Sequence, residues 1–99
     1  MYDLWFSEGV EQDLRAIRPY DRSGIPDAME EALTHAPDTE TRNRKRLSDL
    51  LPPFEFVPPV WELRVGEFRV FYDVDREAKR VYVRAVRHKP PHLTTEEIL

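Results

Sequence analysis

The first third of the chain has the pattern of a short strand followed by two helices. Over residues 2–6, an extended segment would place three apolar side chains on one side, which predicts a strand: Tyr2, Leu4 and Phe6. Ser7 can cap a helix after it, and Pro19 ends that helix near Arg18. Apolar residues then recur at spacings of four and three on one helical face: Val10, Leu14 and Ile17.

A second helix begins at Ile25, where Pro26 is well placed in the first turn. It ends before Pro37, because a residue that precedes proline avoids the helical region. Its apolar face consists of four residues: Ile25, Met29, Ala32 and Leu33. Two helices joined by a short turn predict a helical hairpin.

Residues 41–60 follow neither the helical nor the strand period. Residues 41–47 form a basic run, which is typical of a solvated loop. The segment LLPPFEFVPPV, residues 50–60, holds two Pro-Pro pairs, and each proline removes a backbone donor. We therefore expect a stiff, extended connector here and neither a central strand nor a helix.

Strict alternation returns at Trp61. Residues 61–65 and 68–72 alternate on either side of Gly66-Glu67, which predicts a two-strand hairpin. One face of this hairpin is apolar, and the other carries Arg64 and Arg69.

After a turn at residues 75–78, residues 81–86 predict a last strand. The order βααβββ predicts an α+β fold. We expect a small, mainly antiparallel sheet that is packed on one side by the N-terminal helical hairpin.

Length and composition narrow the class of protein. Ninety-nine residues suffice for one modest core, so we expect a single domain over residues 1–99. The absence of cysteine excludes disulfides and thiolate metal sites and suits a reducing cytosol. The N-terminus lacks the basic flank of a signal peptide, and no apolar run reaches the roughly 18 residues that cross a bilayer. We therefore expect a cytoplasmic protein without a membrane partner.

The net charge of −4 conceals an asymmetry along the chain. Residues 1–41 hold three Arg against ten acidic residues, whereas residues 42–99 hold twelve Lys or Arg against nine. The overall charge argues against a nucleic-acid partner, because phosphate binding needs a basic surface. The basic second part restores that possibility; the alternative is two solvated faces of opposite sign.

Arg64 and Arg69 are the most informative candidates for a binding site. Alternation puts both on the non-core side of adjacent antiparallel strands, with Cβ atoms about 5–8 Å apart. Two guanidinium groups this close repel each other unless an anion such as a phosphate lies between them. The alternative is that Glu62 and Glu67 neutralise them in surface ion pairs, which stabilise little.

Other basic residues could extend such a site along RNA. Four cations of the basic run can contact a phosphate backbone: Arg42, Arg44, Lys45 and Arg46. Arg84 in the last strand is a further candidate RNA contact, although the face it occupies depends on the strand register. A solvated loop is the alternative for the basic run.

His88 and Lys89 follow the last strand. Near two arginines they could assist phosphoryl chemistry, His88 by proton transfer and Lys89 by charge stabilisation. Pro90 and Pro91 prevent the helix that would bring His88 and His92 to one metal ion, and no third ligand is evident. With no glycine-rich phosphate loop either, we expect neither a metal nor a cofactor.

The segment WELRVGEFRVFYDVDREAKRVYVRAV, residues 61–86, resembles the signature hairpin of RelE/ParE-superfamily toxins. In that hairpin an aromatic-x-Leu-Arg strand, a glycine turn and an aromatic-Arg-Val-x-Tyr strand recur. The upstream TRNRKRL, residues 41–47, is similar to the basic stretch that precedes it, and the first strand and helical hairpin come in the expected order. The resemblance implies a curved antiparallel sheet with an N-terminal helical hairpin, and a toxin silenced by a partner antitoxin.

For the ribosome-dependent nucleases of this superfamily, the resemblance implies metal-free cleavage of mRNA by attack of the ribose 2′-hydroxyl on its own phosphate. By position, Arg69 matches the arginine of the aromatic-Arg-Val motif, and Arg64 matches a basic position on the preceding strand. His88 and Lys89 fall near a histidine and a basic residue that follow the last strand. The implied partners are the antitoxin and ribosome-bound mRNA.

Two departures from the family pattern favour other functions. Glu62 occupies a position that is frequently basic. The C-terminal tyrosine that many nucleases use to stack a base is missing, because Leu93-Thr94-Thr95 stands in that region. The alternatives are a non-enzymatic inhibitor of the ParE type, which binds DNA gyrase, and an inactive relative that only binds the antitoxin.

Overall fold

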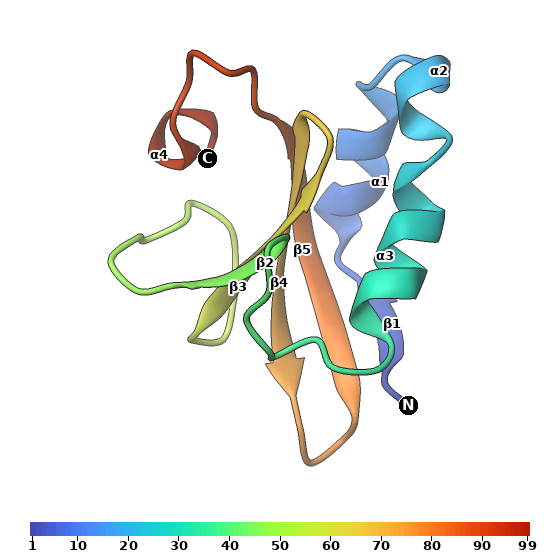
Figure 1. Cartoon of the computed structure of the whole chain (residues 1–99), viewed down its shortest axis with the longest axis vertical. Coiled ribbons are helices and arrows are strands. Elements are labelled where there is room, and N and C mark those ends of the chain that lie inside the picture. The colour runs from blue at the N-terminus through green and yellow to red at the C-terminus, as the bar shows by residue number, and fades with distance from the viewer.

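The computed structural model describes all residues, 1–99. Its elements are β1 (Asp3–Phe6), α1 (Glu8–Arg15), α2 (Pro19–Arg22), α3 (Ile25–Leu33), β2 (Arg44–Leu47), β3 (Val60–Val65), β4 (Phe68–Asp75), β5 (Arg80–His88) and α4 (Thr95–Ile98). The strands form one sheet in the order β1-β5-β4-β3-β2. Helices α1 to α3 lie on one side of this sheet, and α4 and the loop of residues 48–59 lie on the other (Figure 1).

The predicted α+β class and the N-terminal helical hairpin are confirmed. Strands β3, β4 and β5 form the expected antiparallel meander. The sheet is mixed and not purely antiparallel, because β1 pairs in parallel with β5, with Leu4 opposite Val81. A parallel pair needs a crossover connection, and here the rest of the fold separates the two strands in sequence.

The basic run that was expected to be a loop contains β2. Its residues pair antiparallel with β3, so that Lys45 lies opposite Glu62 and Leu47 lies opposite Val60. The prediction missed this strand because only Leu47 in it is apolar. Lys and Arg on a short edge strand discourage pairing with a further strand.

The end of the first helix also differs from the prediction. Helix α1 ends at Arg15, and Pro19 starts α2. Arg18 between them has extended backbone (φ −56°, ψ 142°), because the residue before a proline avoids the helical region. Ser7 occupies the N-cap position of α1, but its hydroxyl donates to the carbonyl of Arg84 at 2.8 Å and so ties α1 to β5.

We call the side of the sheet that contacts α1 and α3 the helix face. Its core comprises Tyr2, Val10, Ile25, Met29, Leu33, Trp61, Leu63, Val70, Tyr72, Val81, Val83 and Val86. A β-bulge between Phe71 and Tyr72 and their partners on β5 lets Val83 and Val86, three residues apart, both reach this core.

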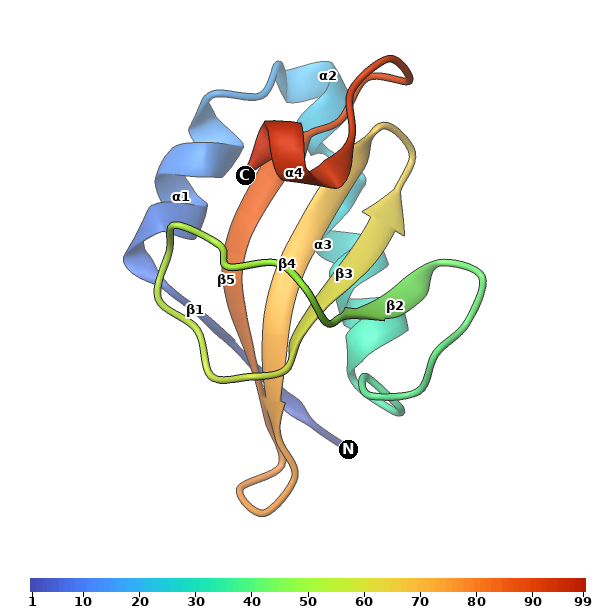
Figure 2. The ribbon, with the colours of Figure 1, turned by 90° about the vertical axis from the view of Figure 1, so that its left-hand side faces the viewer.

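We call the other side of the sheet the far face. A smaller core lies on it around Val60, Phe71 and Ala85. The loop of residues 48–59 contributes Phe54 and Phe56, and the C-terminus contributes Ile98 and Leu99. Figure 2 looks onto this face, with the loop and α4 in front of β4 and β5. The C-terminal segment therefore forms a cover over part of the far face.

Candidate functional site

Three arginines lie side by side on the far face. The register places Arg64 of β3 opposite Arg69 of β4, and Arg69 opposite Arg87 of β5. We call these residues the arginine row. The predicted pairing of Arg64 with Arg69 agrees with this register. Arg87 was missed, because the bulge in β5 decides its face and leaves no signal in the sequence.

The three guanidinium groups have different environments. Arg64 is exposed and makes no salt bridge. Arg69 is only 7% exposed, and its Nη1 donates to the carbonyls of Gly66 and Phe68, both at 2.9 Å. Desolvation lowers the pKa of Arg69, Glu62 opposes this shift, and Arg64 adds to it. Arg69 therefore also braces the β3–β4 turn.

Arg87 is held from the side by α1. Its Nη1 donates to Asp13 Oδ2 at 2.7 Å, and the same carboxylate oxygen accepts from the amide of Val86 at 2.9 Å. The guanidinium carbon lies 5.9 Å from the ring centroid of Phe54 in the loop. Asp13 thus binds the backbone of β5 at Val86 and also orients the side chain of Arg87.

Glu62 lies on the same face, diagonal to Arg69 and only 5% exposed. Its Oε2 accepts a hydrogen bond from the Thr95 hydroxyl at 2.8 Å, and its Oε1 lies 3.7 Å from Lys45 Nζ. The contact with Thr95 joins the C-terminal cover to the sheet beside the arginine row. The carboxylate at this usually basic position thus offsets part of the positive charge of the far face.

Arg84, predicted as an RNA contact, is bound within the protein. Its Nε donates to Asp73 Oδ2 at 2.7 Å and its Nη2 donates to Oδ1 at 3.2 Å. The hydrogen bond with Asp73 raises the pKa of Arg84, against the effect of burial. Asp73 is only 2% exposed and also accepts from the amide of Val57 at 3.1 Å. This pair anchors the loop to β4 and β5.

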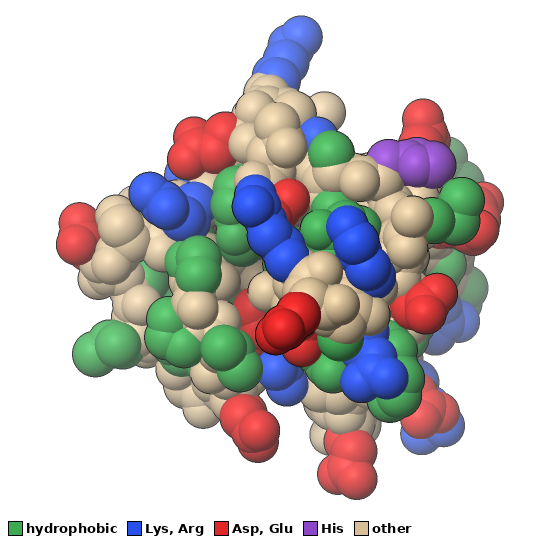
Figure 3. All heavy atoms as spheres, turned by 90° about the horizontal axis from the view of Figure 1, so that it is seen from below, with side chains coloured by type: hydrophobic (Ala, Val, Ile, Leu, Met, Phe, Trp, Pro, Cys, Tyr) green, Lys and Arg blue, Asp and Glu red, His purple; other side chains and the backbone are tan.

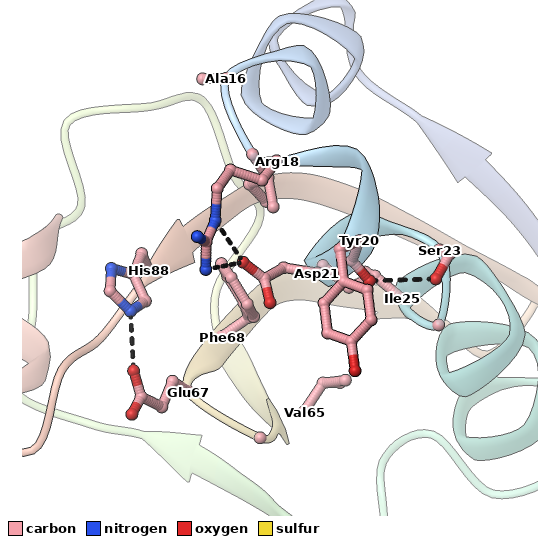
Figure 4. Close-up of a pocket in the computed structure, with 13 residues that line it drawn as sticks. Ala16, Arg18, Tyr20, Asp21, Ser23, Ile25, Val65, Glu67, Phe68 and His88 are labelled. Carbon is pink, nitrogen blue, oxygen red and sulfur yellow. Dashed lines mark hydrogen bonds and ion pairs between the residues drawn. The ribbon is translucent and has the colours of Figure 1, made fainter.

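His88 does not lie with the arginine row, so the expectation that it would is wrong. Its register partner is Phe68, which packs on the helix face, and the two rings are 5.1 Å apart. His88 Nε2 lies 2.9 Å from Glu67 Oε1 (Figure 4). The histidine borders an open groove of about 1010 Å³ between the β3–β4 turn and the turn from α1 to α3.

Lys89 follows β5 at the edge of the arginine row. Its backbone amide donates to the carbonyl of Glu67 at 2.6 Å.

The basic run does not act as one surface. Arg42 is exposed ahead of β2, whereas Arg44 donates through Nη1 to the carbonyl of Ala32 and through Nε to that of Thr39. Arg46 lies opposite Trp61, on the helix-face side of β2. Alternation along β2 leaves only Lys45 on the far face with the arginine row.

We also searched the structure for groups of metal-binding side chains and for helices that could span a membrane. The structure contains no group of three or more His, Cys, Asp or Glu side chains that could hold a metal ion. None of its helices is both long and apolar enough to span a membrane.

Comparison with solved structures finds the same fold in toxins. The chain is similar to the toxin–antitoxin complex RelBE2 from Mycobacterium tuberculosis, with a TM-score of 0.71 and 23% identity over 89% of this chain and 98% of that one. It is also similar to the archaeal RelE–RelB complex from Pyrococcus horikoshii, with a TM-score of 0.67 and 16% identity over 94% and 98% of the two chains. For a mutant of Escherichia coli RelE in the free state, the TM-score is 0.55 and the identity 20%, over 89% and 82%.

No curated protein matches the chain by sequence. Residues 4–89, in contrast, match the sequence family described as "ParE toxin of type II toxin-antitoxin system, parDE". This match runs from β1 to the residue after β5 and includes the arginine row. The chain therefore belongs to the ParE toxin family, within the RelE/ParE superfamily of type II toxins.

Proposed function

We propose that this toxin inhibits translation as a metal-free endoribonuclease of ribosome-associated mRNA in the cytoplasm, and that a cognate antitoxin silences it. The arginine row carries the proposal. Neighbouring strands are about 4.7–4.9 Å apart, so three guanidinium groups in register can surround one phosphate. Arginine forms paired, charge-assisted hydrogen bonds with phosphate oxygens.

In the proposed reaction the ribose 2′-oxygen attacks the adjacent phosphorus, the bond to the 5′-oxygen breaks, and a cyclic phosphate forms. Negative charge then grows on the phosphate oxygens, where fixed donors stabilise the transition state. Arg64 is exposed, has no internal partner and is the member of the row that a phosphate can reach most easily. Arg69 is only 7% exposed and Arg87 is paired with Asp13, so these two would add positive charge behind Arg64. Lys89 would add positive charge at the edge of this site.

The site lacks a side chain placed to transfer the proton of the 2′-hydroxyl. His88 lies across the sheet and is bound to Glu67, so it cannot reach a phosphate on the arginine row in this arrangement. General acid–base catalysis typically contributes 10²–10⁴-fold. We therefore expect slow or substrate-restricted cleavage.

The test is induction without antitoxin in a bacterial host, with amino-acid and thymidine incorporation followed separately and the 5′ ends of mRNA mapped. We expect protein synthesis to stop first, with new mRNA ends. Arg64→Gln should relieve both effects. The matched control is Arg15→Gln, which changes an exposed arginine on α1 that pairs only with Glu11. Unchanged toxicity of Arg64→Gln would contradict the proposal.

The second candidate is a non-enzymatic inhibitor of DNA gyrase. The distance of His88 from the arginine row and the buried carboxylate of Glu62 favour it, because binding needs neither a proton carrier nor a fully basic face. In the same experiment thymidine incorporation would fall first. Purified protein would then inhibit supercoiling by gyrase and leave mRNA intact.

A further inference from the structure

A second groove opens beside the Arg64 end of the arginine row. It lies between α3 and the edge where β2 meets β3, and its volume of about 370 Å³ falls within the roughly 300–1,000 Å³ of small-molecule sites. Four small or apolar side chains form part of its walls: Ala28, Ala32, Leu63 and Val65. Arg64 belongs to the row and also lines this groove. A nucleotide whose phosphate lies on Arg64 would therefore have its base close to the groove.

Hydrogen bonds within the protein hold the walls of this groove in place. Arg44 donates through Nη1 to the carbonyl of Ala32, which joins the end of α3 to β2. Thr41 Oγ1 accepts from the amides of Asn43 and Arg44, both at 3.2 Å. The amide of Arg64 donates to the carbonyl of Asn43 at 2.7 Å. The guanidinium of Arg44 is thus engaged within the protein, and Asn43 is fixed next to Arg64.

Two polar side chains of the groove are left free for a ligand. The hydrogen bonds of Asn43 involve its backbone, so its side-chain amide can donate and accept. Glu31 on α3 is exposed and makes no salt bridge, and the oxygens of an ionised carboxylate only accept. Glu31 would repel a phosphate, whereas Arg64 attracts it. Charge therefore favours a phosphate on Arg64 and a neutral base with N–H donors in the groove.

Guanine is the base whose donors and acceptors fit these side chains best. Single-stranded RNA is read through the Watson–Crick edges of its unstacked bases. Along this edge guanine presents two neighbouring N–H donors, at N1 and N2, and the acceptor O6. Glu31 can accept from both donors, and the Asn43 amide can donate to O6. Adenine, cytosine and uracil each present an acceptor next to a single donor group, and a carboxylate repels that acceptor.

The end of the molecule opposite the arginine row is less suited to RNA. Figure 3 looks onto this end, with the β4–β5 turn, where basic side chains lie among acidic ones. Arg76 there is paired with Asp38, and Lys79 and Arg80 each lie over an aromatic ring. These cations form no row that a phosphate backbone could follow. The arginine row and the groove beside Arg64 therefore form the more suitable surface for RNA.

We propose that this groove binds a guanine base next to the scissile phosphate, with Glu31 and Asn43 as the residues that determine base specificity. Arg64 would hold the phosphate, and the apolar walls would pack on the base. The inference rests on the proposed function, because it takes RNA as the ligand. It adds a sequence preference that the arginine row alone does not provide, since contacts to phosphate carry no sequence information.

The first test measures binding without cleavage. Free toxin, obtained from its complex with the antitoxin by unfolding and refolding, is titrated with guanosine 3′-monophosphate or adenosine 3′-monophosphate and followed by NMR. We expect a Kd at least about fivefold lower for the guanosine nucleotide, with shifts of the Asn43 side-chain amide, because a carboxylate that accepts two hydrogen bonds discriminates by about this factor or more. Glu31→Gln should reduce the preference to less than about twofold. Glu30→Gln, which changes the neighbouring exposed carboxylate outside the groove, should keep it.

The second test uses the mRNA ends of the induction experiment. A guanine should adjoin most new ends, and Glu31→Gln should lower the fraction of ends with guanine while cleavage continues. Equal Kd values for the two nucleotides, or an unchanged guanine preference in Glu31→Gln, would overturn the inference. New ends without a guanine bias would also overturn it and leave the ribonuclease proposal intact. A guanosine preference of the free toxin without any mRNA cleavage would support the groove and contradict only the ribonuclease proposal.

Discussion

The buried pair of Asp73 and Arg84 offers the sharpest test of how the loop of residues 48–59 is held on the far face. The side chains of Asp73 and Arg84 are 3% and 14% exposed. The two oxygens of Asp73 accept from Nε and Nη2 of Arg84, and Oδ2 also accepts from the amide of Val57. In Asp73→Ala, a guanidinium and an amide would therefore lose their partner together.

The expected loss follows from leaving the partly buried guanidinium of Arg84 and the amide of Val57 without their shared partner. Removing one partner of a buried ion pair typically costs about 3–5 kcal/mol. The whole free energy of unfolding of a small protein is about 5–15 kcal/mol. With a urea dependence of about 1.5 kcal/mol per M, a loss of 3 kcal/mol lowers the midpoint by about 2 M. Asp73→Ala should therefore be folded only marginally.

Urea unfolding followed by circular dichroism measures this loss, with two companion variants. Glu11→Ala removes an exposed partner of Arg15 and should change the free energy of unfolding by less than about 0.5 kcal/mol. The double variant Asp73→Ala/Arg84→Met replaces the pair with apolar groups and should regain more than half of the loss. A loss below about 1 kcal/mol for Asp73→Ala, or a double variant no more stable than the single one, would refute the reasoning.

Three further substitutions test other parts of the structure. Tyr72→Phe removes a buried hydroxyl that donates to the carbonyl of Pro37 at 2.6 Å, and should cost about 1–3 kcal/mol at pH 7 in urea unfolding. Burial raises the pKa of Tyr72, so wild-type stability should fall as the pH rises above about 10, where the unfolded chain ionises; this part of the fall should be absent in Tyr72→Phe. Gly66→Ala, at a φ of +57°, should lower stability by about 1–2 kcal/mol, and an equal stability would show that the turn relaxes. Thr95→Val removes the donor to the buried Glu62 and should cost about 1 kcal/mol and speed proteolysis after residue 89; unchanged cleavage would show that the C-terminal cover is held by packing alone.

Much of the fold was predictable, because alternation and helical spacing are local signals. The meander from residue 61 onward and the second helix, with Pro26 in its first turn, agree with the structure. β2 escaped prediction because its stability comes from pairing with β3 and not from apolar side chains of its own. The parallel pairing of β1 with β5 also depends on contacts between distant parts of the chain, for which a single sequence carries no local signal.

The composition of the site was less predictable than the fold, because one extra residue in β5, Arg84, changes which side chains lie on each face. Tyr72 pairs with Val83 and Phe71 pairs with Ala85, so the bulge leaves Arg84 as an extra residue. Regular alternation from Val83 would turn His88 to the far face and Arg87 to the helices, since a shift of one residue exchanges the two faces of a strand. The bulge reverses this: Val86 completes the main core, Arg87 joins Arg64 and Arg69, and His88 leaves them. Arg84 is thus the extra residue of the bulge and also the partner of Asp73. Its insertion decides which basic side chains of β5 lie on the far face with Arg64 and Arg69. A cluster of three arginines without the histidine favours charge stabilisation over proton transfer, which is why we expect a weak nuclease and keep a binding inhibitor as the alternative.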